Sequence, residues 1–305
     1  MRRAAGHEDD TGRATKSPGA SLYVVATPIG NLKDLTFRAL EVLRNVDVIA
    51  AEDTRITSKL LNHYAIAAKR LIALHEHNEQ RTAPQVIAQL DAGRSVALVS
   101  DAGTPAFSDP GARVVAAVRE AGFPVIPIPG PNAAAAALSV SGLAGAHFLF
   151  YGFLPAKAGE RRNALEGIAS LPYMLVFYEA PHRVIEAVAD LAQALGVSRR
   201  LLIAREITKL FETIHECALG EAEAWLRADT DRIKGEFVLI VEGAPHRDAA
   251  VLGEATRTLK ILLDELPVKQ AAALAARITG ARKNELYALA LEFRENAGER
   301  TKRRG

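Results

Sequence analysis

Short apolar runs alternate with longer segments of helical periodicity along the first half of the chain. Five runs rich in β-branched residues predict strands at 22–26, 46–50, 71–74, 95–99 and 124–128. Apolar positions between them recur at helical spacing and predict helices at 35–44, 55–63, 79–92 and 111–121. This alternation is typical of right-handed crossovers and a mostly parallel sheet covered on both faces. In such a sheet, ligands bind at the carboxyl ends of the strands.

The second half repeats the alternation less regularly. Strand-like runs lie at 147–151, 173–178, 201–205, 213–218 and 237–241, with helical patterns at 159–170, 181–195 and 219–228. The runs 201–205 and 213–218 are close enough to form an antiparallel pair, which predicts a mixed sheet. Only helical patterns follow, at 254–265, 268–278 and 284–296, and Gly280 suits the turn between the last two.

These patterns predict two α/β domains and a helical extension. The expected order is a disordered lead-in at 1–20, an α/β domain at 21–143, a second α/β domain at 146–245, a helical extension at 250–298 and a basic tail at 299–305. The first domain is expected to hold the parallel sheet and the second the mixed sheet.

Composition limits the kinds of binding partner and cellular setting but identifies no single ligand. The 305 residues carry 38 Lys and Arg against 36 Asp and Glu, so an anion-binding surface must come from local clusters of charge. Cys217 is the only cysteine, which excludes an internal disulfide and fits a reducing, cytoplasmic setting. No run is apolar enough for a membrane span, and the first twenty residues lack the apolar core of a signal peptide.

Glycine and proline cluster directly after three of the predicted strands. The loops are TPIGN at 27–31, SDAGTPAFSDPG at 100–111 and PGPNA at 129–133. None contains the glycine pattern that binds a pyrophosphate, so a zwitterionic or cationic small molecule suits them better. In the second loop, Asp109 is expected to cap the next helix with Pro110 at its first position, while Asp101 contributes an anion to a cavity rim.

Six further motifs complete an ordered set. They are AEDTR at 51–55, HEHNE at 75–79, YGFLP at 151–155, FYEAPHRV at 177–184, AREITKLFE at 204–212 and GEFVLIVEG at 235–243. In this order and spacing, residues 21–245 resemble the small-subunit ribosomal RNA methyltransferase I family of the tetrapyrrole methylase superfamily. The helical end resembles the helix-turn-helix extension of that family.

The resemblance implies a cofactor, an acceptor and a cleft. S-adenosylmethionine is the expected methyl donor, and the acceptor is the 2′-hydroxyl of a cytidine in the decoding region of small-subunit (16S) RNA, within the assembled subunit. A homodimer is also expected, with the cofactor between the two α/β domains. Transferred motif by motif, the expected cofactor residues are Pro28, Ile29, Gly30, Asp101, Ala102, Gly103, Thr104, Asn132, Ala133, Tyr178, Glu179, Gly235 and Glu236.

A ribose hydroxyl reacts faster when a base takes its proton, and several acidic or imidazole groups follow strand ends. The candidates are Glu52, Asp53, Glu179, Glu206 and His182, in no order of preference. Each of the carboxylates has an alternative role as the ion-pair partner of a nearby arginine.

RNA binding needs cations that contact phosphates. Basic residues just after strand ends are the candidates: Arg55, Lys157, Arg161, Arg162, Arg205 and Lys209. The C-terminal helices offer Arg277, Arg282 and Lys283 for RNA, with packing in a dimer as the alternative.

Three other interpretations remain. His75 and His77 alternate as metal ligands do, but they lack a third ligand, and we expect no metal site. A corrin or porphyrin precursor methylase could use the same scaffold, although its substrate has no need of a helix-turn-helix. An RNA-binding assembly factor without transferase activity is the third alternative.

Overall fold

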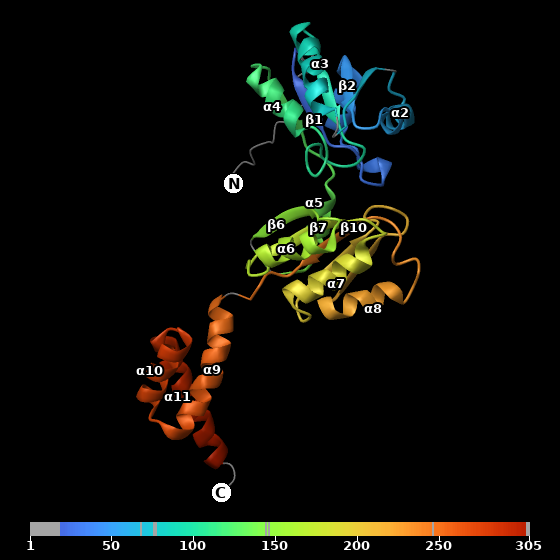
Figure 1. Cartoon of the computed structure of the whole chain (residues 1–305). Helices are drawn as coiled ribbons and strands as arrows, with labels where there is room; N and C mark the ends of the chain where they lie inside the picture. The colour runs from blue at the N-terminus through green and yellow to red at the C-terminus, as the bar shows by residue number, and fades with distance from the viewer. Residues whose placement is uncertain are drawn as a thin grey trace, which may run out of the picture.

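The computed structural model describes residues 19–67, 69–75, 78–143, 145, 147–245 and 247–302. Two α/β units lie one after the other, and a bundle of helices extends from the second (Figure 1). Most of the expected lead-in at 1–20 and the last residues of the basic tail lie outside the described residues.

The first unit is built on a five-stranded parallel sheet. Its strands are β1 (Leu22–Val25), β2 (Val48–Ala51), β3 (Arg70–Ala73), β4 (Val96–Val99) and β5 (Val125–Ile128). They lie in the order β3-β2-β4-β1-β5, and every adjacent pair is parallel. The predicted strands and the parallel sheet are confirmed.

Helices cover both faces of this sheet. They are α1 (Phe37–Asn45), α2 (Thr54–His63), α3 (Glu79–Asp91) and α4 (Ala112–Glu120), with a short 3-10 turn, η1 (Leu32–Asp34), after β1. Alternate strand residues serve opposite cores, since Leu98 packs with α3 and α4 while Ala97 and Val99 pack with α1 and α2. All four residues of β4 are buried, as a strand covered on both faces requires.

The second unit has the expected mixed sheet. Its strands are β6 (Phe148–Phe153), β7 (Met174–Glu179), β8 (Arg200–Arg205), β9 (Thr213–Ala218) and β10 (Phe237–Val241), in the order β6-β7-β10-β8-β9. Strands β6 and β7 are parallel, and every other adjacent pair is antiparallel. The helices α6 (Ala158–Ile168), α7 (Val184–Leu195) and α8 (Leu219–Arg227) pack on one face.

One short helix covers the opposite face. Helix α5 (Ala133–Ser139) follows β5 in sequence, yet Ala134 and Ala137 pack against Val176 of β7 and Val238 of β10. The sequence assigned this segment to the first unit at 21–143. Its alanines instead let the helix lie close to the second sheet, so packing divides the chain just before α5.

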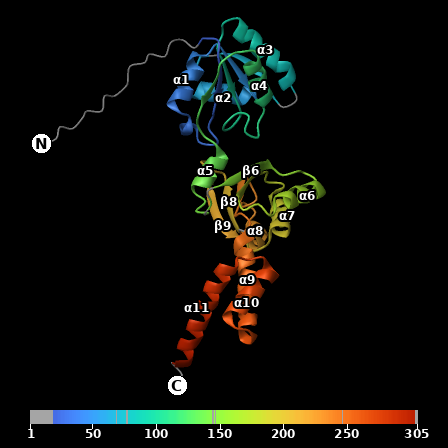
Figure 2. The ribbon, with the colours of Figure 1, turned by 90° about the vertical axis from the view of Figure 1, so that its left-hand side faces the viewer.

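The helical extension has a core of its own. Helices α9 (Arg247–Glu265), α10 (Val268–Thr279) and α11 (Lys283–Lys302) bury Leu259, Ala272 and Leu286 among themselves. Gly280 ends α10 in the left-handed conformation, with a φ of 75°. The bundle lies on the side of the second unit away from the first (Figure 2).

Candidate active site

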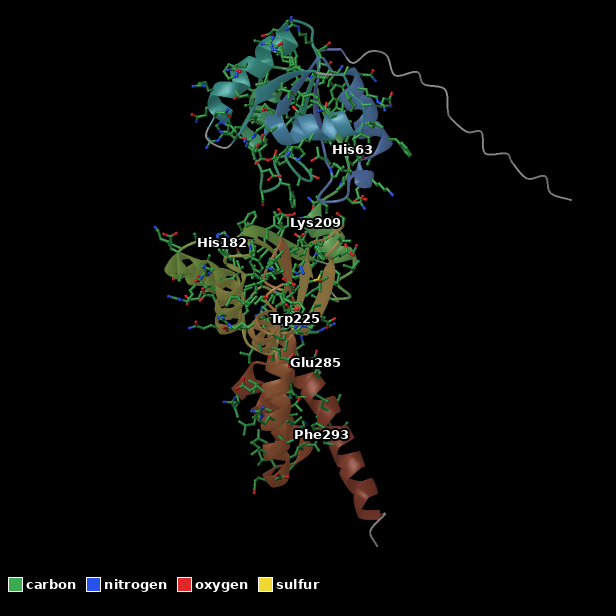
Figure 3. The ribbon with its side chains drawn as sticks, turned by 90° about the vertical axis from the view of Figure 1, so that its right-hand side faces the viewer. His63, His182, Lys209, Trp225, Glu285 and Phe293 are labelled. Carbon is green, nitrogen blue, oxygen red and sulfur yellow. The ribbon has the colours of Figure 1, made fainter. Side chains whose placement is uncertain are left out.

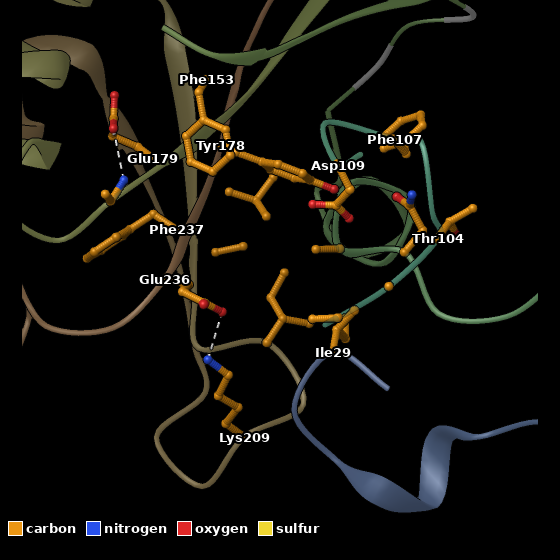
Figure 4. Close-up of a pocket in the computed structure, with 18 of the residues that line it drawn as sticks. Ile29, Thr104, Phe107, Asp109, Phe153, Tyr178, Glu179, Lys209, Glu236 and Phe237 are labelled. Carbon is orange, nitrogen blue, oxygen red and sulfur yellow. Dashed lines mark hydrogen bonds and ion pairs between the residues drawn. The ribbon is translucent and has the colours of Figure 1, made fainter. Parts of the chain in front are cut away.

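A cavity of about 330 Å³ lies between the two α/β units, with Lys209 at this boundary (Figures 3 and 4). Its first-unit wall consists of Ile29, Ala102, Gly103, Thr104, Phe107 and Asp109. Asn132 and Ala133 come from the third loop, which follows β5, and the opposite side consists of Phe153, Tyr178, Glu179, Ala180, Pro181, Ala204, Ile207, Lys209, Glu236, Phe237 and Val238. Loops from one sheet therefore face strands and loops of the other, as the sequence predicted.

Backbone hydrogen bonds hold the first-unit loops together. Thr27 and Gly103 exchange two N–H to C=O bonds of 2.9 and 3.0 Å. Gly103 adopts a φ of +83°, and an added Cβ would lie 3.3 Å from Ile29 Cγ2. Thr104 Oγ1 donates to the Pro131 carbonyl at 3.1 Å, which joins the second loop to the third. These bonds join the three loops into one rim, and its small residues leave backbone exposed to a ligand.

The loop at 101–111 also contacts the second unit. Phe107 stacks on Phe150 of β6 with ring centroids 4.1 Å apart, and Phe150 meets Tyr178 edge-on at 5.0 Å. On either side of Phe107, Ala106 and Ser108 have φ values of 64° and 63°. Left-handed backbone in residues other than glycine is strained by roughly 1–2 kcal/mol each, and the stacked ring stabilises it here.

Asp109 does not cap α4, and the prediction that it does is wrong. Gly111 is the N-cap residue, with a φ of 131°, and its N–H is donated to the Glu79 carboxylate of α3. This contact with a residue 32 positions away cannot be seen in local sequence. Asp109 is therefore free to turn into the cavity, on the side of Tyr178 (Figure 4).

The surroundings of Asp109 disfavour its charge. Burial, the nearby charge of Glu52 and, more weakly, that of Asp101 raise the pKa of Asp109 to about 7, and the Ser100 hydroxyl only partly offsets them. No salt bridge to Asp109 occurs among the residues that the structure describes. An aspartate with a pKa near neutrality in a cavity is a candidate for proton transfer.

Two of the predicted catalytic residues are held as anions by cations. Asp53 caps α2 and lies 2.6 Å from the Arg55 guanidinium, whose hydrogen bonds lower the pKa of Asp53 to about 2. Burial acts to raise the pKa of Glu206, but the Lys209 ammonium at 2.8 Å and the Glu236 backbone N–H outweigh it and lower the pKa.

The other two predicted carboxylates have raised pKa values. Burial raises the pKa of Glu52, whose carboxylate accepts the Asp101 N–H at 3.2 Å. Burial also raises the pKa of Glu179, which accepts the Ala180 N–H at 2.8 Å and lies 3.2 Å from Arg183. Figure 4 shows the Glu179 carboxylate at the edge of the cavity, bonded to backbone. His182 does not line the cavity.

Most residues expected to bind the cofactor lie around this cavity. They are Ile29, Ala102, Gly103, Thr104, Asn132, Ala133, Tyr178, Glu179 and Glu236. Pro28 and Asp101 instead line a neighbouring cavity of about 180 Å³ beside α2, and Gly30 and Gly235 line neither. Whether these residues contact a cofactor stays a prediction.

Several lining residues lie in motifs that the sequence analysis singled out, but they were not expected to line the cavity. Ala204, Phe237 and Val238 belong to apolar strands, where alternation indicates a shared face but not that part of the face is open. Phe107 and Phe153 are bulky residues in loop or edge positions, and only the approach of the two units gives them a role.

Two arginines expected to bind RNA are buried. Arg161 is 2% exposed and pairs through Nε with Asp190 at 2.6 Å, which fastens α6 to α7. Arg205 is 8% exposed and lies on the face of β8 that carries Ile203, toward α7 and α8. Burial of both side chains argues against a phosphate contact, so neither is carried into the proposed RNA surface.

The other predicted cations are accessible. Arg55, Lys157 and Arg162 have exposed side-chain fractions of 86%, 81% and 46%. Lys209 lines the cavity, where it pairs with Glu206 and Glu236 at 2.8 and 2.9 Å.

No group of three metal-ligating side chains occurs within the described part of the chain, and His77 lies outside it. Among the same residues, no helix is both long and apolar enough to cross a bilayer.

Comparison with known proteins decides the family. The family of Tetrapyrrole (Corrin/Porphyrin) Methylases matches residues 21–223, and the RsmI C-terminal HTH domain matches residues 249–294. Ribosomal RNA small subunit methyltransferase I of Escherichia coli O157:H7 is 54% identical over 271 residues, covering 89% of this chain and 94% of that protein. The chain belongs to the ribosomal RNA small subunit methyltransferase I family. The resemblance inferred from the motifs is confirmed.

Solved structures of other methyltransferases share the fold of this family member. The methyltransferase CobJ aligns with a TM-score of 0.55 at 20% identity, over 73% of this chain and 94% of that one. Uroporphyrin-III C-methyltransferase from Thermus thermophilus, complexed with S-adenyl homocysteine, aligns at 0.50 and 19% identity, over 72% and 96%. The two α/β units thus form a tetrapyrrole methylase fold, and the HTH match coincides with the helices that follow them.

Proposed function

We propose that this protein is an S-adenosylmethionine-dependent methyltransferase that modifies the 2′-hydroxyl of a cytidine in the decoding region of small-subunit ribosomal RNA. The supporting observation is an acid-bearing cavity between the two α/β units of a chain in this family. The substrate is the assembled or nearly assembled small subunit, and the enzyme acts as a cytoplasmic homodimer.

The residues around the cavity suit S-adenosylmethionine. Its adenine needs flat apolar surfaces, and Ile29, Phe107 and Ile207 offer them. Its sulfonium and ammonium groups are cationic, and Glu236 supplies a carboxylate of opposite charge. The lack of a pyrophosphate-binding glycine motif is consistent with a ligand that has no phosphate.

When bound, the cofactor supplies a methyl group on positively charged sulfur. The protein must then align the hydroxyl oxygen, methyl carbon and sulfur, and positioning of this kind can supply much of the rate enhancement. The hydrogen bonds between the loops at 27–31, 101–105 and 130–134 hold one wall of the cavity in place for this purpose.

The RNA is held from outside the cavity. Arg55 follows β2, and Lys157 and Arg162 lie at the start of α6 after β6, all with exposed side chains. The helical extension adds Arg277, Arg282 and Lys283 around the turn between α10 and α11. Such cations bind phosphates without distinguishing one base from another. The target nucleotide must therefore be selected by contacts in the cavity and by its position in the particle.

Labelled S-adenosylmethionine tests this function. The protein is incubated with small-subunit particles that lack the modification, with free RNA, and with a tetrapyrrole precursor, and each product is digested and analysed. Label in the 2′-O-methyl group of one cytidine is the expected result. Label in the tetrapyrrole indicates a corrin or porphyrin methylase, and particle binding without transfer indicates an assembly factor.

A further inference from the structure

The loop at 101–111 delivers one carboxylate, that of Asp109, to the cavity, and no salt bridge to it occurs among the described residues. We propose that Asp109 is the catalytic residue that accepts the proton of the ribose hydroxyl during methyl transfer. This inference rests on the proposed function. It gives a catalytic role to a residue that the sequence alone predicts to be a helix cap.

The first support is position. Asp109 lines the same cavity as Thr104 and Tyr178, on the side turned toward the second unit (Figure 4). It makes no capping hydrogen bond to α4, whose N-cap residue is Gly111. A carboxylate that caps no helix and lines a cavity is available for chemistry.

The second support is the set of groups that face it. Glu52 from the end of β2 and Asp101 from the end of β4 are acidic, while Ser100 and Tyr178 of β7 carry hydroxyls. The cavity's ammonium group, that of Lys209, is already paired with Glu206 and Glu236. The surroundings thus favour protonation of Asp109. A general base works best when its pKa lies near the working pH, and these surroundings move Asp109 in that direction.

The third support is strain in the backbone that presents it. Ala106 and Ser108 both occupy the left-handed region, and Phe107 between them is stacked on Phe150. Strain of this kind persists where the surrounding structure fixes a functional geometry. Contact between the two units therefore sets the position of Asp109.

The other carboxylates are less suited. Asp53 and Glu206 are tied to Arg55 and Lys209, and both remain anions with lowered pKa values, which makes them weak bases. Glu179 is bonded to Ala180 and paired with Arg183 at the edge of the cavity. Glu52 accepts the Asp101 N–H and does not line the cavity.

The step balances without a further reactant. The O–H bond of the ribose breaks and its proton moves to the Asp109 carboxylate, while the hydroxyl oxygen forms a bond to the methyl carbon. The carbon–sulfur bond breaks, and its electron pair remains on sulfur. The products are a methyl ether, a neutral thioether and a protonated Asp109.

Asp109→Asn tests the assignment directly because it keeps the shape and removes the base. We expect kcat on small-subunit particles to fall by roughly 10²–10⁴-fold, with S-adenosylmethionine still bound and the thermal midpoint not lowered. Asp91→Asn makes the same chemical change at the exposed end of α3 and is expected to leave kcat unchanged.

Glu52→Gln adds a readout that a structural role would not move. Removing the charge of Glu52 lowers the pKa of Asp109, so the rising limb of the pH–rate profile should move to lower pH. Transfer by Asp109→Asn at the wild-type rate, or an unmoved limb in Glu52→Gln, would overturn this inference alone. Absence of transfer by the wild-type protein would overturn the proposed function as well.

Discussion

Asp109 shows how one residue can lower stability where its charge is needed. The cavity raises its pKa from an ordinary 3.8 to about 7, so folding makes this group bind a proton that the unfolded chain has released. Stability from this group is present below about pH 4 and is lost as pH rises toward 7. A pKa shift of this size would correspond to about 4 kcal/mol in the free energy of unfolding for a fully buried group. Asp109 is partly exposed, so its contribution is smaller.

The Asp109→Asn protein should accordingly be more stable than the wild type in mildly alkaline solution. We expect a gain of about 1–2 kcal/mol in the free energy of unfolding at pH 8 and little difference at pH 4. Thermal unfolding at the two pH values measures this. A gain of equal size at both would show that the charge of Asp109 is not responsible.

Arg161 and Lys157 look alike in sequence and differ in structure. Arg161→Ala leaves the carboxylate of Asp190 without its close partner, and we expect a loss of about 3–5 kcal/mol in stability. Lys157→Ala removes an exposed cation, and we expect stability within about 0.5 kcal/mol of the wild type.

In RNA binding, the larger effect is expected for Lys157→Ala, whereas in stability it is expected for Arg161→Ala. Lys157→Ala is expected to lower the salt slope of particle binding by about 0.7–0.9, while Arg161→Ala leaves the slope unchanged. Filter binding across a salt series measures both. A reduced slope for folded Arg161→Ala would contradict the structural role given to this arginine.

The sequence held a weak signal for Arg161. It lies four residues before the buried Leu165 and so on the inner face of α6, whereas Arg162 lies outside. The predicted exposure of Arg161 rests only on its charge and its position after a strand. The helical spacing of α6 contradicts it. No comparable signal distinguished Asp109, since the contact of Gly111 with Glu79 depends on the packing of α3 against α4.

At the scale of elements, most of the fold was predictable. The strands of the two α/β units, and all their helices except α5, lie within a few residues of the predicted ranges because most have a clear apolar period. Strand order and the placement of α5 were not predictable, because they depend on contacts between distant segments. The cavity depends on both the strand order and the position of α5. The sequence therefore identified the loops that line the cavity but not the strand residues of the second sheet that line it.

Gly30 determines how closely the loop after β8 approaches the loop after β1. A Cβ at Gly30 would lie 2.4 Å from Lys209 Cγ and 2.9 Å from Thr208 Oγ1, which accepts the Asn31 N–H. We expect Gly30→Ala to cost about 1–3 kcal/mol in stability and to weaken cofactor binding, because Lys209 lines the cavity.

Gly159→Ala is the matched control for Gly30→Ala. Gly159 lies in α6 with open space around its Cβ position, and the change should stabilise the protein by about 0.5–1 kcal/mol. Calorimetry and thermal unfolding of both variants test the pair. Equal effects would show that the approach of the two loops is not close enough to matter.

At the scale of the whole molecule, the helical extension is separable from the cavity. Among the residues that the structure describes, its buried core residues come from α9, α10 and α11, and none of them lines the cavity. Ending the chain at residue 246 should therefore leave S-adenosylmethionine binding unchanged. The same truncation should weaken binding to small-subunit particles, because it removes Arg277, Arg282 and Lys283.

Filter binding and calorimetry of the truncated protein separate these outcomes. Full-strength particle binding without the extension would contradict its role in gripping RNA. Loss of cofactor binding would show instead that the extension supports the two α/β units.

The central claim is that the cavity between the two units binds S-adenosylmethionine, and calorimetric titration tests it most directly. Ala102→Trp places a bulky ring at an exposed position of the cavity rim, and Ala92→Trp places the same ring at the exposed end of α3. We expect one cofactor per chain in the wild type and Ala92→Trp, and a large loss of affinity in Ala102→Trp. No uptake by folded wild-type protein, or equal affinity in all three, would contradict the account.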